Sequence, residues 1–328
     1  MRFRASGNGG ERRCRLFYAS DIHGSDRCFR KWVNAARVYK VDALVFGGDI
    51  AGKIVVPIVR FSRDRYVLEL YGRTLELAPG EELEAVRSRI RASGRYDVVL
   101  SPDEKRAFDQ RPDLVAGELF PAAMRQSLGS WLELAEERLE QVGIPAFVML
   151  GNDDHPELAG LLDGTWLRYV EERVVELPGG FEMLSLGYSN RTPWHSPREL
   201  EDGELGARVE ALASQLKEPQ HAVFNLHCPP HDTHLDQAAL LDDQFRPRTA
   251  GGQVVTGPVG SAAVRRLIER YQPALGLHGH IHESPGVQRL GRSLVLNAGS
   301  EYGDGVLRGA LVTLDRAKGV RSWQLVQG

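Results

Sequence analysis

The stretch "LHGHIHES", Leu277–Ser284, places histidines at the alternate positions 278, 280 and 282. Alternate side chains of a strand face the same side of a sheet, so these imidazoles would crowd together. Protonating more than one of them without a counter-ion is costly, whereas a bound metal satisfies imidazoles in their neutral form. The stretch is therefore either an ordinary buried strand or the edge of a metal site, and the rest of the chain decides between them.

Strand-like and helix-like patterns alternate along the chain. Short runs rich in Val, Leu and Phe, such as "RLFYAS", "ALVFGG", "AFVML", "AVFNLH", "ALGLHG" and "SLVLNAGS", indicate buried strands of a central sheet. Helical patterns cover residues 25–40, 122–143 and 261–271, where Ser261 is a candidate N-cap and Pro273 ends the last helix. This alternation predicts a layered α/β fold.

The segment from about residue 53 to 121 interrupts this alternation. It contains a hairpin-like pattern over 54–78, a helix-like pattern over 81–94 and the strand-like run "YDVVL". We interpret it as a small cap inserted into a single domain that spans residues 1–328. The late runs "GALVTLD" and "RSWQLVQ" alternate apolar and polar residues, which predicts antiparallel strands at a sheet edge.

Composition excludes several classes of protein. The 41 Lys and Arg against 44 Asp and Glu give a net charge of -3, so no global field favours nucleic acid or anionic lipid. The first fifteen residues carry five arginines without an apolar stretch, so we expect a solvated tail, a cytoplasmic location and no membrane span. Cys14, Cys28 and Cys228 form no CxxC pair, which indicates reduced thiols.

Five clusters of metal-type ligands stand where predicted strands end: "DIHG" at Asp21, "GGDI" at Asp49, "GNDDH" at Asn152, "NLHCPPH" at His227 and "HGHIH" at His278. Residues beyond the carboxyl ends of parallel strands converge on one crevice. Carboxylate, imidazole and amide oxygen together suit manganese, iron or zinc. One cluster alone is weak evidence, but five in order, each closing a strand, favour a metal site.

This ordered set resembles the calcineurin-like metallophosphoesterases, with motifs that run from Asp21 to His282. The resemblance implies a layered α/β/β/α sandwich with mixed sheets and an inserted α+β cap. It also implies two divalent metal ions, manganese preferred with iron or zinc as alternatives, and a bridging hydroxide as nucleophile. Carried over residue by residue, it assigns one metal to Asp21, His23 and His282, the other to Asn152, His227 and His280, and the bridge to Asp49.

Position 153 departs from the family pattern, because Asp153 stands where the family has the histidine that contacts the phosphate and protonates the leaving group. A protonated Asp153 could donate, His155 or His231 could replace the histidine, or the reaction could proceed without an acid. Equally, Asp153 and Asp154 could only orient the metal ligands.

Several neighbouring residues carry weaker hypotheses. Arg191 and Trp194 are candidates for holding a phosphate and stacking on a base, with Asn152 as a further substrate contact, although an ordinary surface loop explains the pair as well. For His278 and His234 we expect supporting or surface positions, and for Cys228 a buried thiol.

Three functions remain open at this stage. Metal-dependent hydrolysis of a phosphoester fits the motifs, with a diester or cyclic diester preferred over a monoester and a nucleotide or nucleic-acid-derived substrate as a candidate. A non-catalytic scaffold that binds protein partners is the alternative that the missing histidine suggests. The stretch "GGDIAGK", Gly47–Lys53, also matches a phosphate-binding NTPase loop, but Ile54 replaces the hydroxyl residue that would hold magnesium.

Overall fold

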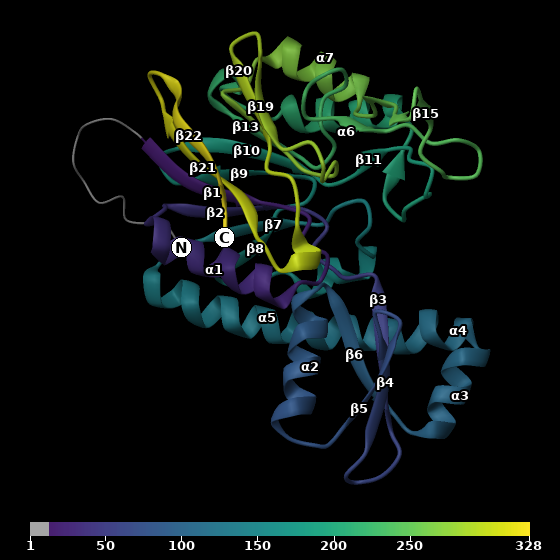
Figure 1. Ribbon diagram of the computed structural model, residues 1–328. Helices are drawn as coiled ribbons and strands as arrows, with labels where there is room; N and C mark the ends of the chain where they lie inside the picture. Colours follow the sequence, from purple (N-terminus) through teal and green to yellow (C-terminus); the bar gives the residue numbers. More distant parts are fainter. Residues whose placement is uncertain (1–12) are drawn as a thin grey trace.

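Two six-stranded sheets pack face to face in the computed structural model, which describes residues 13–328 (Figure 1). Most of the predicted arginine-rich tail lies outside the described residues. The N-terminal sheet consists, in spatial order, of β22 (Gly319–Gln327), β21 (Arg308–Asp315), β1 (Arg13–Ala19), β2 (Ala43–Gly47), β7 (Ala146–Met149) and β8 (Leu167–Tyr169). The C-terminal sheet consists of β19 (Gly286–Leu290), β20 (Ser293–Asn297), β18 (Leu275–His278), β13 (Val223–Leu226), β10 (Phe181–Leu186) and β9 (Arg173–Leu177).

Each sheet is parallel in its centre and antiparallel at one or both edges. The parallel pairs are β1–β2, β2–β7 and β7–β8 in the first sheet and β10–β13, β13–β18 and β18–β20 in the second. The late strands β21 and β22 pair antiparallel at the edge of the N-terminal sheet, as the alternation predicted. Parallel centres bring the carboxyl ends of several strands to one edge of each sheet.

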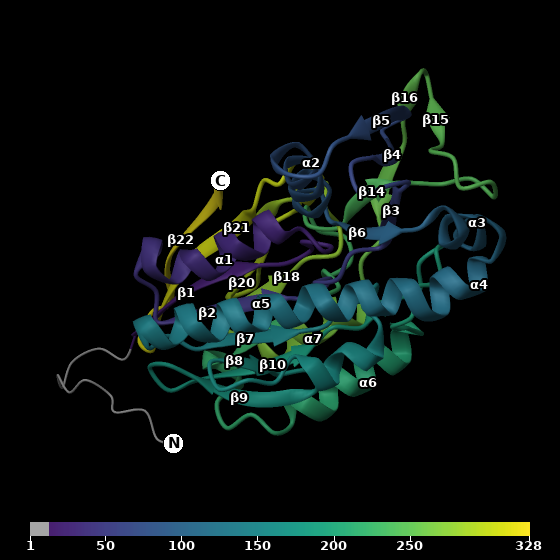
Figure 2. The ribbon, with the colours of Figure 1, turned by 90° about the horizontal axis from the view of Figure 1, so that it is seen from below.

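Helices cover the outer faces of both sheets (Figures 1 and 2). The helices α1 (Asp26–Tyr39) and α5 (Phe120–Val142) cover the N-terminal sheet, and α6 (Asp202–Ala213) and α7 (Ala262–Tyr271) cover the C-terminal sheet. The predicted helices are confirmed: Ser25 and Ser261 accept N-cap hydrogen bonds from Cys28 N and Val264 N.

Three apolar clusters separate these layers. One lies between the N-terminal sheet and its helices, with Trp32 and Trp131 at its centre, and another lies between the C-terminal sheet and its helices. The cluster between the two sheets contains Phe147 and Phe181. The predicted α/β/β/α sandwich with mixed sheets is therefore confirmed. The expectation of one central sheet is wrong, because the chain passes to a second sheet between β8 and β9.

The segment between β2 and α5 forms a separate four-stranded sheet with its own apolar cluster. Its strands are β5 (Arg73–Leu77), β4 (Tyr66–Leu70), β3 (Ile54–Arg60) and β6 (Arg95–Leu100). The helix α2 (Glu81–Ala92) follows the predicted helical pattern, whereas α3 (Pro102–Gln110), α4 (Pro112–Leu114) and the π-helical turn η1 (Val115–Leu119) were not predicted. The boundaries of the cap at 53 and 121 stay a prediction.

Short elements complete the loops around the sandwich. They are η2 (Pro156–Leu161), β11 (Ser189–Asn190), β12 (Glu199–Leu200), η3 (Pro219–His221), β14 (Gln237–Ala239), β15 (Thr249–Ala250), β16 (Gln253–Val254), β17 (Thr256–Pro258) and η4 (Tyr302–Asp304). Among residues 13–328, no helix combines the length and the apolar character that crossing a membrane requires. The cytoplasmic location stays a prediction.

Candidate metal centre

The predicted ligands follow the carboxyl ends of strands in both sheets. Asp21 and His23 follow β1, Asp49 follows β2, Asn152 follows β7, His227 follows β13, and His280 and His282 follow β18. Backbone hydrogen bonds join the first two loops, since Asp21 N donates to Gly48 O at 2.9 Å and His23 N donates to Asp49 O at 3.0 Å. Residues more than 250 positions apart in the chain therefore meet at one crevice beyond the strand ends.

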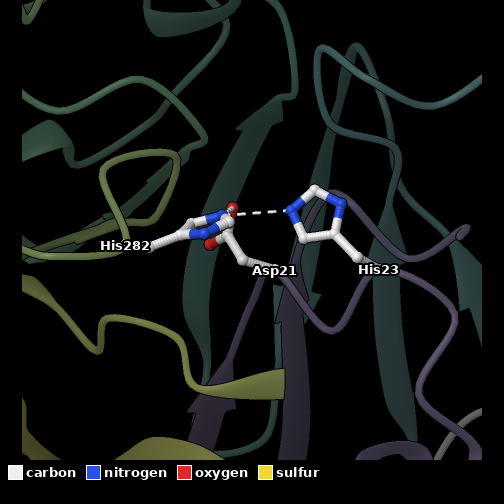
Figure 3. A group of neighbouring side chains, drawn as sticks. All are labelled: Asp21, His23 and His282. Atoms are coloured by element: carbon white, nitrogen blue, oxygen red, sulfur yellow. Dashed lines mark hydrogen bonds and ion pairs between the residues drawn. The ribbon is translucent and has the colours of Figure 1, made fainter. Parts of the chain in front are cut away.

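One group of donors consists of Asp21, His23 and His282 (Figure 3). The Nε2 atoms of His23 and His282 face each other at 3.0 Å. His282 Nε2 also lies 3.4 Å from Asp21 Oδ1. Asp21 and His23 are each 1% exposed, so this group is shielded from water on the side of the N-terminal sheet.

A second group of donors consists of Asp21, Asp49 and His227. His227 Nε2 lies 3.4 Å from Asp49 Oδ2 and 3.0 Å from Asn152 Oδ1. The same Asp49 Oδ2 lies 3.6 Å from His23 Nε2 in the first group. Asp49 Oδ2 thus lies near an imidazole of each group, and Asp21 belongs to both groups.

The protonation of His227 tests whether these donors fit a cation. Its Nδ1 donates to the carbonyl of Gly47 at 2.7 Å, so the neutral ring presents an unprotonated Nε2 to the acceptor oxygens of Asn152 and Asp49. Because His227 Nε2 and these oxygens are all acceptors, their close approach requires either a second proton on the His227 ring or a cation between them. Ligand atoms about 2.0–2.2 Å from one metal lie about 3 Å apart, which agrees with the distances to Asn152 and Asp49.

Without a metal, the second proton is retained by His227. Burial alone lowers the pKa of this imidazole, but the Asp49 and Asp21 carboxylates outweigh that effect and raise the pKa to about 10. His280 shows the opposite balance, because burial dominates and lowers its pKa to about 4. The donor set of carboxylates, imidazoles and one amide oxygen fits manganese, iron or zinc.

Backbone conformation at the ligands is unusual. Asp21, His23, Asp49 and His280 have φ values of 56°, 41°, 56° and 68°, in the left-handed region that non-glycine residues seldom adopt. The turn at His280 directs its N–H to both carboxylate oxygens of Asp21, at 3.1 Å each. Strain of roughly 1–3 kcal/mol per residue collects at functional sites, where the surrounding structure holds it in place.

Asp154 connects the loop after β2 with the loop after β7. Its buried carboxylate accepts hydrogen bonds from Ile50 N, Ala51 N and Gly151 N at 3.0, 2.8 and 2.8 Å. Burial, followed by the nearby charge of Asp49, raises the pKa of Asp154 to about 7 against the effect of these bonds. These contacts match the hypothesis that Asp154 orients the ligand loops.

The same contacts exclude the phosphate-loop interpretation of "GGDIAGK". The N–H groups of Ile50 and Ala51 bind Asp154, and Gly52 N donates to Tyr96 Oη at 2.8 Å. Backbone donors that would cradle a phosphate are therefore occupied inside the protein. Gly52 is needed for close packing instead, because a Cβ there would lie 2.5 Å from Gly94 O.

Asp153 lies beside the ligands and makes polar contacts with Asp49, Ser196, Lys53 and Asn152. Its N–H donates to Asp49 Oδ1 at 3.0 Å, and its carboxylate accepts from Ser196 Oγ at 2.6 Å. The same carboxylate forms an ion pair with Lys53. The catalytic role of Asp153 stays a prediction, but its N–H is hydrogen-bonded to the carboxylate of Asp49.

Two other predicted residues have their described contacts away from the ligands. His155 Nδ1 lies 3.9 Å from Glu157 Oε2 with 53% of its side chain exposed. Arg191 Nε donates to Glu201 Oε1 at 3.0 Å with 55% of its side chain exposed. The catalytic role of His155 and the substrate contact of Arg191 therefore stay predictions without support from these contacts.

The remaining side chains of the motifs have structural contacts. His278 is buried, and its Nδ1 donates to the carbonyls of Leu226 and Cys228 at 2.9 and 3.0 Å. Burial lowers the pKa of His278 to about 4, so its ring is neutral. The thiol of Cys228 is buried and donates to Asn190 Oδ1 at 2.8 Å, in agreement with the expected structural thiol.

Ser196 and Lys53 were missed as neighbours of the ligands. Ser196 Oγ accepts from Asn152 Nδ2 at 3.0 Å, which turns the amide oxygen of Asn152 toward His227. Ser196 lies in the same loop as Arg191, and Lys53 lies in the rejected phosphate-loop motif. Both residues lie close in sequence to motif residues, and this closeness is the signal that could have identified them. The contacts of Ser196 with Asn152 and of Lys53 with Asp153, however, span 44 and 100 positions in the chain.

Comparisons with known proteins place this architecture among solved structures. No protein-family model matches the chain. A stretch of 149 residues is 27% identical to an uncharacterized protein, MJ1162, of Methanocaldococcus jannaschii, and it spans 45% of this chain and 60% of that protein. The structure of TT1561 of Thermus thermophilus matches 96% of this chain and 98% of its own, with a TM-score of 0.51 and 15% identity.

A looser structural likeness extends to an archaeal phosphodiesterase, with a TM-score of 0.32 and 9% identity over 96% of this chain and 99% of its own. The chain therefore shares its overall fold with TT1561, a layered sandwich in which the predicted ligands follow the carboxyl ends of the strands.

Proposed function

We propose that the protein is a metal-dependent phosphoesterase with a dinuclear centre. Asp21, His23 and His282 would hold one metal, Asn152, His227 and His280 would hold the other, and Asp49 would be shared by both; the donor groups Asp21, His23 and His282 and Asp21, Asp49 and His227 support this proposal. The observation that carries this proposal is the position of Asp49 Oδ2, 3.6 Å from His23 Nε2 and 3.4 Å from His227 Nε2. A single carboxylate at such distances from two imidazole groups suits a pair of cations.

When bound, a pair of divalent cations clamps a phosphoryl group and activates water at neutral pH. The protein contributes fixed ligand positions. His280 N orients the Asp21 carboxylate, Gly47 O selects the tautomer of His227, and Ser196 orients the amide of Asn152. The burial of Asp21 and Asp49 keeps water from competing with these ligands. We propose manganese as the native metal, because carboxylates and an amide oxygen supply much of the donor set.

The substrate is proposed to be a phosphodiester or a cyclic phosphodiester. Position 153 carries no imidazole, and the Asp153 carboxylate is paired with Lys53, so the reaction depends on the quality of the leaving group. The four-stranded cap beside the sandwich can shape a site for a substrate larger than a simple monoester. Nucleotide or nucleic-acid-derived diesters belong to this class.

Hydrolysis of bis-p-nitrophenyl phosphate and of p-nitrophenyl phosphate by metal-stripped protein, with and without manganese, tests the proposal. We expect manganese-dependent turnover, faster with the diester. Turnover of the monoester alone would contradict the substrate class. Two bound metals without turnover of either compound would contradict the enzymatic function and support a binding scaffold.

A further inference from the structure

Lys53 lies where the chain leaves the edge of the N-terminal sheet for the cap. It follows Asp49 by four residues and precedes β3 directly. Its ammonium group forms an ion pair with Asp153, and 49% of its side chain is exposed. A cation is therefore both anchored next to the metal ligands and accessible from the solvent.

Asp153 fixes the position of this cation. The Asp153 carboxylate accepts from Ser196 Oγ at 2.6 Å and from Asn152 Nδ2 at 3.2 Å, and its N–H donates to Asp49 Oδ1 at 3.0 Å. Carboxylate oxygens of Asp153 and Asp49 and a ring nitrogen of His23 lie within 4.8 Å of one another. The anchor of Lys53 is thus part of the same crevice as the proposed bridge.

Electrostatics explain why a cation is needed there. An unpaired carboxylate at position 153 would repel a phosphate that approaches the metals, and an adjacent ammonium removes that repulsion. Burial lowers the pKa of Lys53, but its hydrogen bond and ion pair with Asp153, together with the charge of Asp49, outweigh burial and raise the pKa. Lys53 therefore remains charged at neutral pH.

Other cationic candidates near the motifs have different partners. Arg191 pairs with Glu201, and His155 lies near Glu157. His231 Nδ1 lies 3.7 Å from Asp236 Oδ2. Among the described residues, no side-chain hydrogen bond joins these three partners to a proposed metal ligand, whereas the Asp153 partner of Lys53 is hydrogen-bonded to two of them, Asn152 and Asp49.

We propose that Lys53 is a substrate-binding residue whose ammonium group contacts the phosphoryl oxygens, with Asp153 as the residue that positions it. This role rests on the proposed phosphoesterase function. A carboxylate that holds a lysine in a fixed place reduces the conformational freedom lost when the anion binds. In the stretch that resembled a phosphate loop, the Lys53 side chain thus binds phosphate, and the backbone N–H groups do not.

The test compares Lys53→Met, Lys53→Arg and the control Lys105→Met in the manganese-loaded protein. Lys105 is a matched control because it is also paired with an aspartate, Asp109, but lies on α3 of the cap. The measurements are metal content by elemental analysis, the dissociation constant of inorganic phosphate by calorimetry, and KM and kcat for bis-p-nitrophenyl phosphate.

We expect Lys53→Met to keep both metals and to weaken phosphate binding roughly 10- to 100-fold, the range for one charge-assisted hydrogen bond. KM should rise by a similar factor with a smaller change in kcat, Lys53→Arg should recover most of the affinity, and Lys105→Met should match the wild type. Unchanged phosphate affinity or loss of metal in Lys53→Met would overturn the role of Lys53. Failure of the wild type to bind phosphate or hydrolyse either ester would instead overturn the proposed function itself.

Discussion

The two sheets supply chemically different halves of the candidate metal centre. The N-terminal sheet contributes both carboxylates and the amide oxygen, together with His23, from the loops after β1, β2 and β7. The C-terminal sheet contributes only imidazoles, from the loops after β13 and β18. Both carboxylates and the amide oxygen therefore lie on one side of the crevice and three of the four imidazoles on the other, so neither sheet edge forms the centre alone.

The two edges are also held differently. The carboxylate edge is fixed from within its own sheet, through the three backbone N–H bonds to Asp154 that join the loops after β2 and β7. The imidazole edge is fixed by bonds that cross between sheets, such as His227 Nδ1 to Gly47 O.

The largest effect is expected on the carboxylate edge, from Asp49→Ala. Removing the bridge should lower manganese-dependent turnover on the order of 10³-fold or more, beyond the roughly 10- to 100-fold typical of residues that only support a ligand. Elemental analysis should show loss of at least one metal. Asp109→Ala, which removes an exposed cap carboxylate, is the control and should leave both quantities unchanged. Wild-type turnover in Asp49→Ala would sink the assignment of the site.

The next largest effect concerns the buried ion pair between Glu171, in the turn from β8 to β9, and Arg198, which directly precedes β12. Arg198 Nη2 donates to Glu171 Oε1 at 2.6 Å, and Arg198 N donates to Asn152 O at 3.1 Å. Arg198→Met should lower the free energy of unfolding by about 3–5 kcal/mol, because it leaves a buried carboxylate unpaired. Chemical denaturation measures this change.

Arg191→Met is the matched control for that experiment, since its ion pair with Glu201 is exposed. Exposed pairs contribute only about 0–1 kcal/mol. Equal effects of the two substitutions would show that the junction between the sheets does not depend on the buried pair.

A smaller effect is expected on the imidazole edge, from His282→Ala. Its side chain is 33% exposed, so the fold should tolerate the change. We expect turnover to fall by about 10²-fold and the metal of the Asp21 and His23 group to bind more weakly, as for one electrostatic contact in an active site. Asp49→Ala and His282→Ala assayed side by side compare the two halves directly. A loss in His282→Ala as large as in Asp49→Ala would contradict the central position of Asp49.

The smallest effect is the pH dependence of manganese affinity. In the metal-free protein the pKa of His227 is raised to about 10, and that of His282 is also raised, burial being outweighed in both by nearby carboxylates. Coordination needs neutral imidazoles, so metal binding releases protons below pH 10 and the affinity should rise with pH. One released proton corresponds to about a tenfold change per pH unit.

Calorimetry between about pH 6.5 and 8.5, in buffers with different ionisation enthalpies, measures both the affinity and the proton release. An affinity that does not change over this range would contradict the protonated state of His227 in the metal-free protein.

Much of the site was predictable because each ligand stands at the end of a recognisable strand. The helices with Ser25 and Ser261 caps and the antiparallel strands β21 and β22 followed from local patterns as well. The assignment of strands to two sheets was not predictable, because buried strands of either sheet show the same continuous apolar runs. The helix α3 was missed although Ser101, Pro102 and Glu104 form a capping-box pattern, because its predominantly polar sequence has no buried residue to give an apolar periodicity.

By itself, the sequence determined which donor types occur and in what order along the chain, because each motif is local and closes a strand. Only the tertiary structure decided which donors meet, and it paired Lys53 with Asp153 and Asn152 with Ser196. It also set the left-handed turns at the ligands, such as those at Asp49 and His280. The physical reason is that these contacts and conformations depend on the packing of two sheets against each other, a property that no single segment carries.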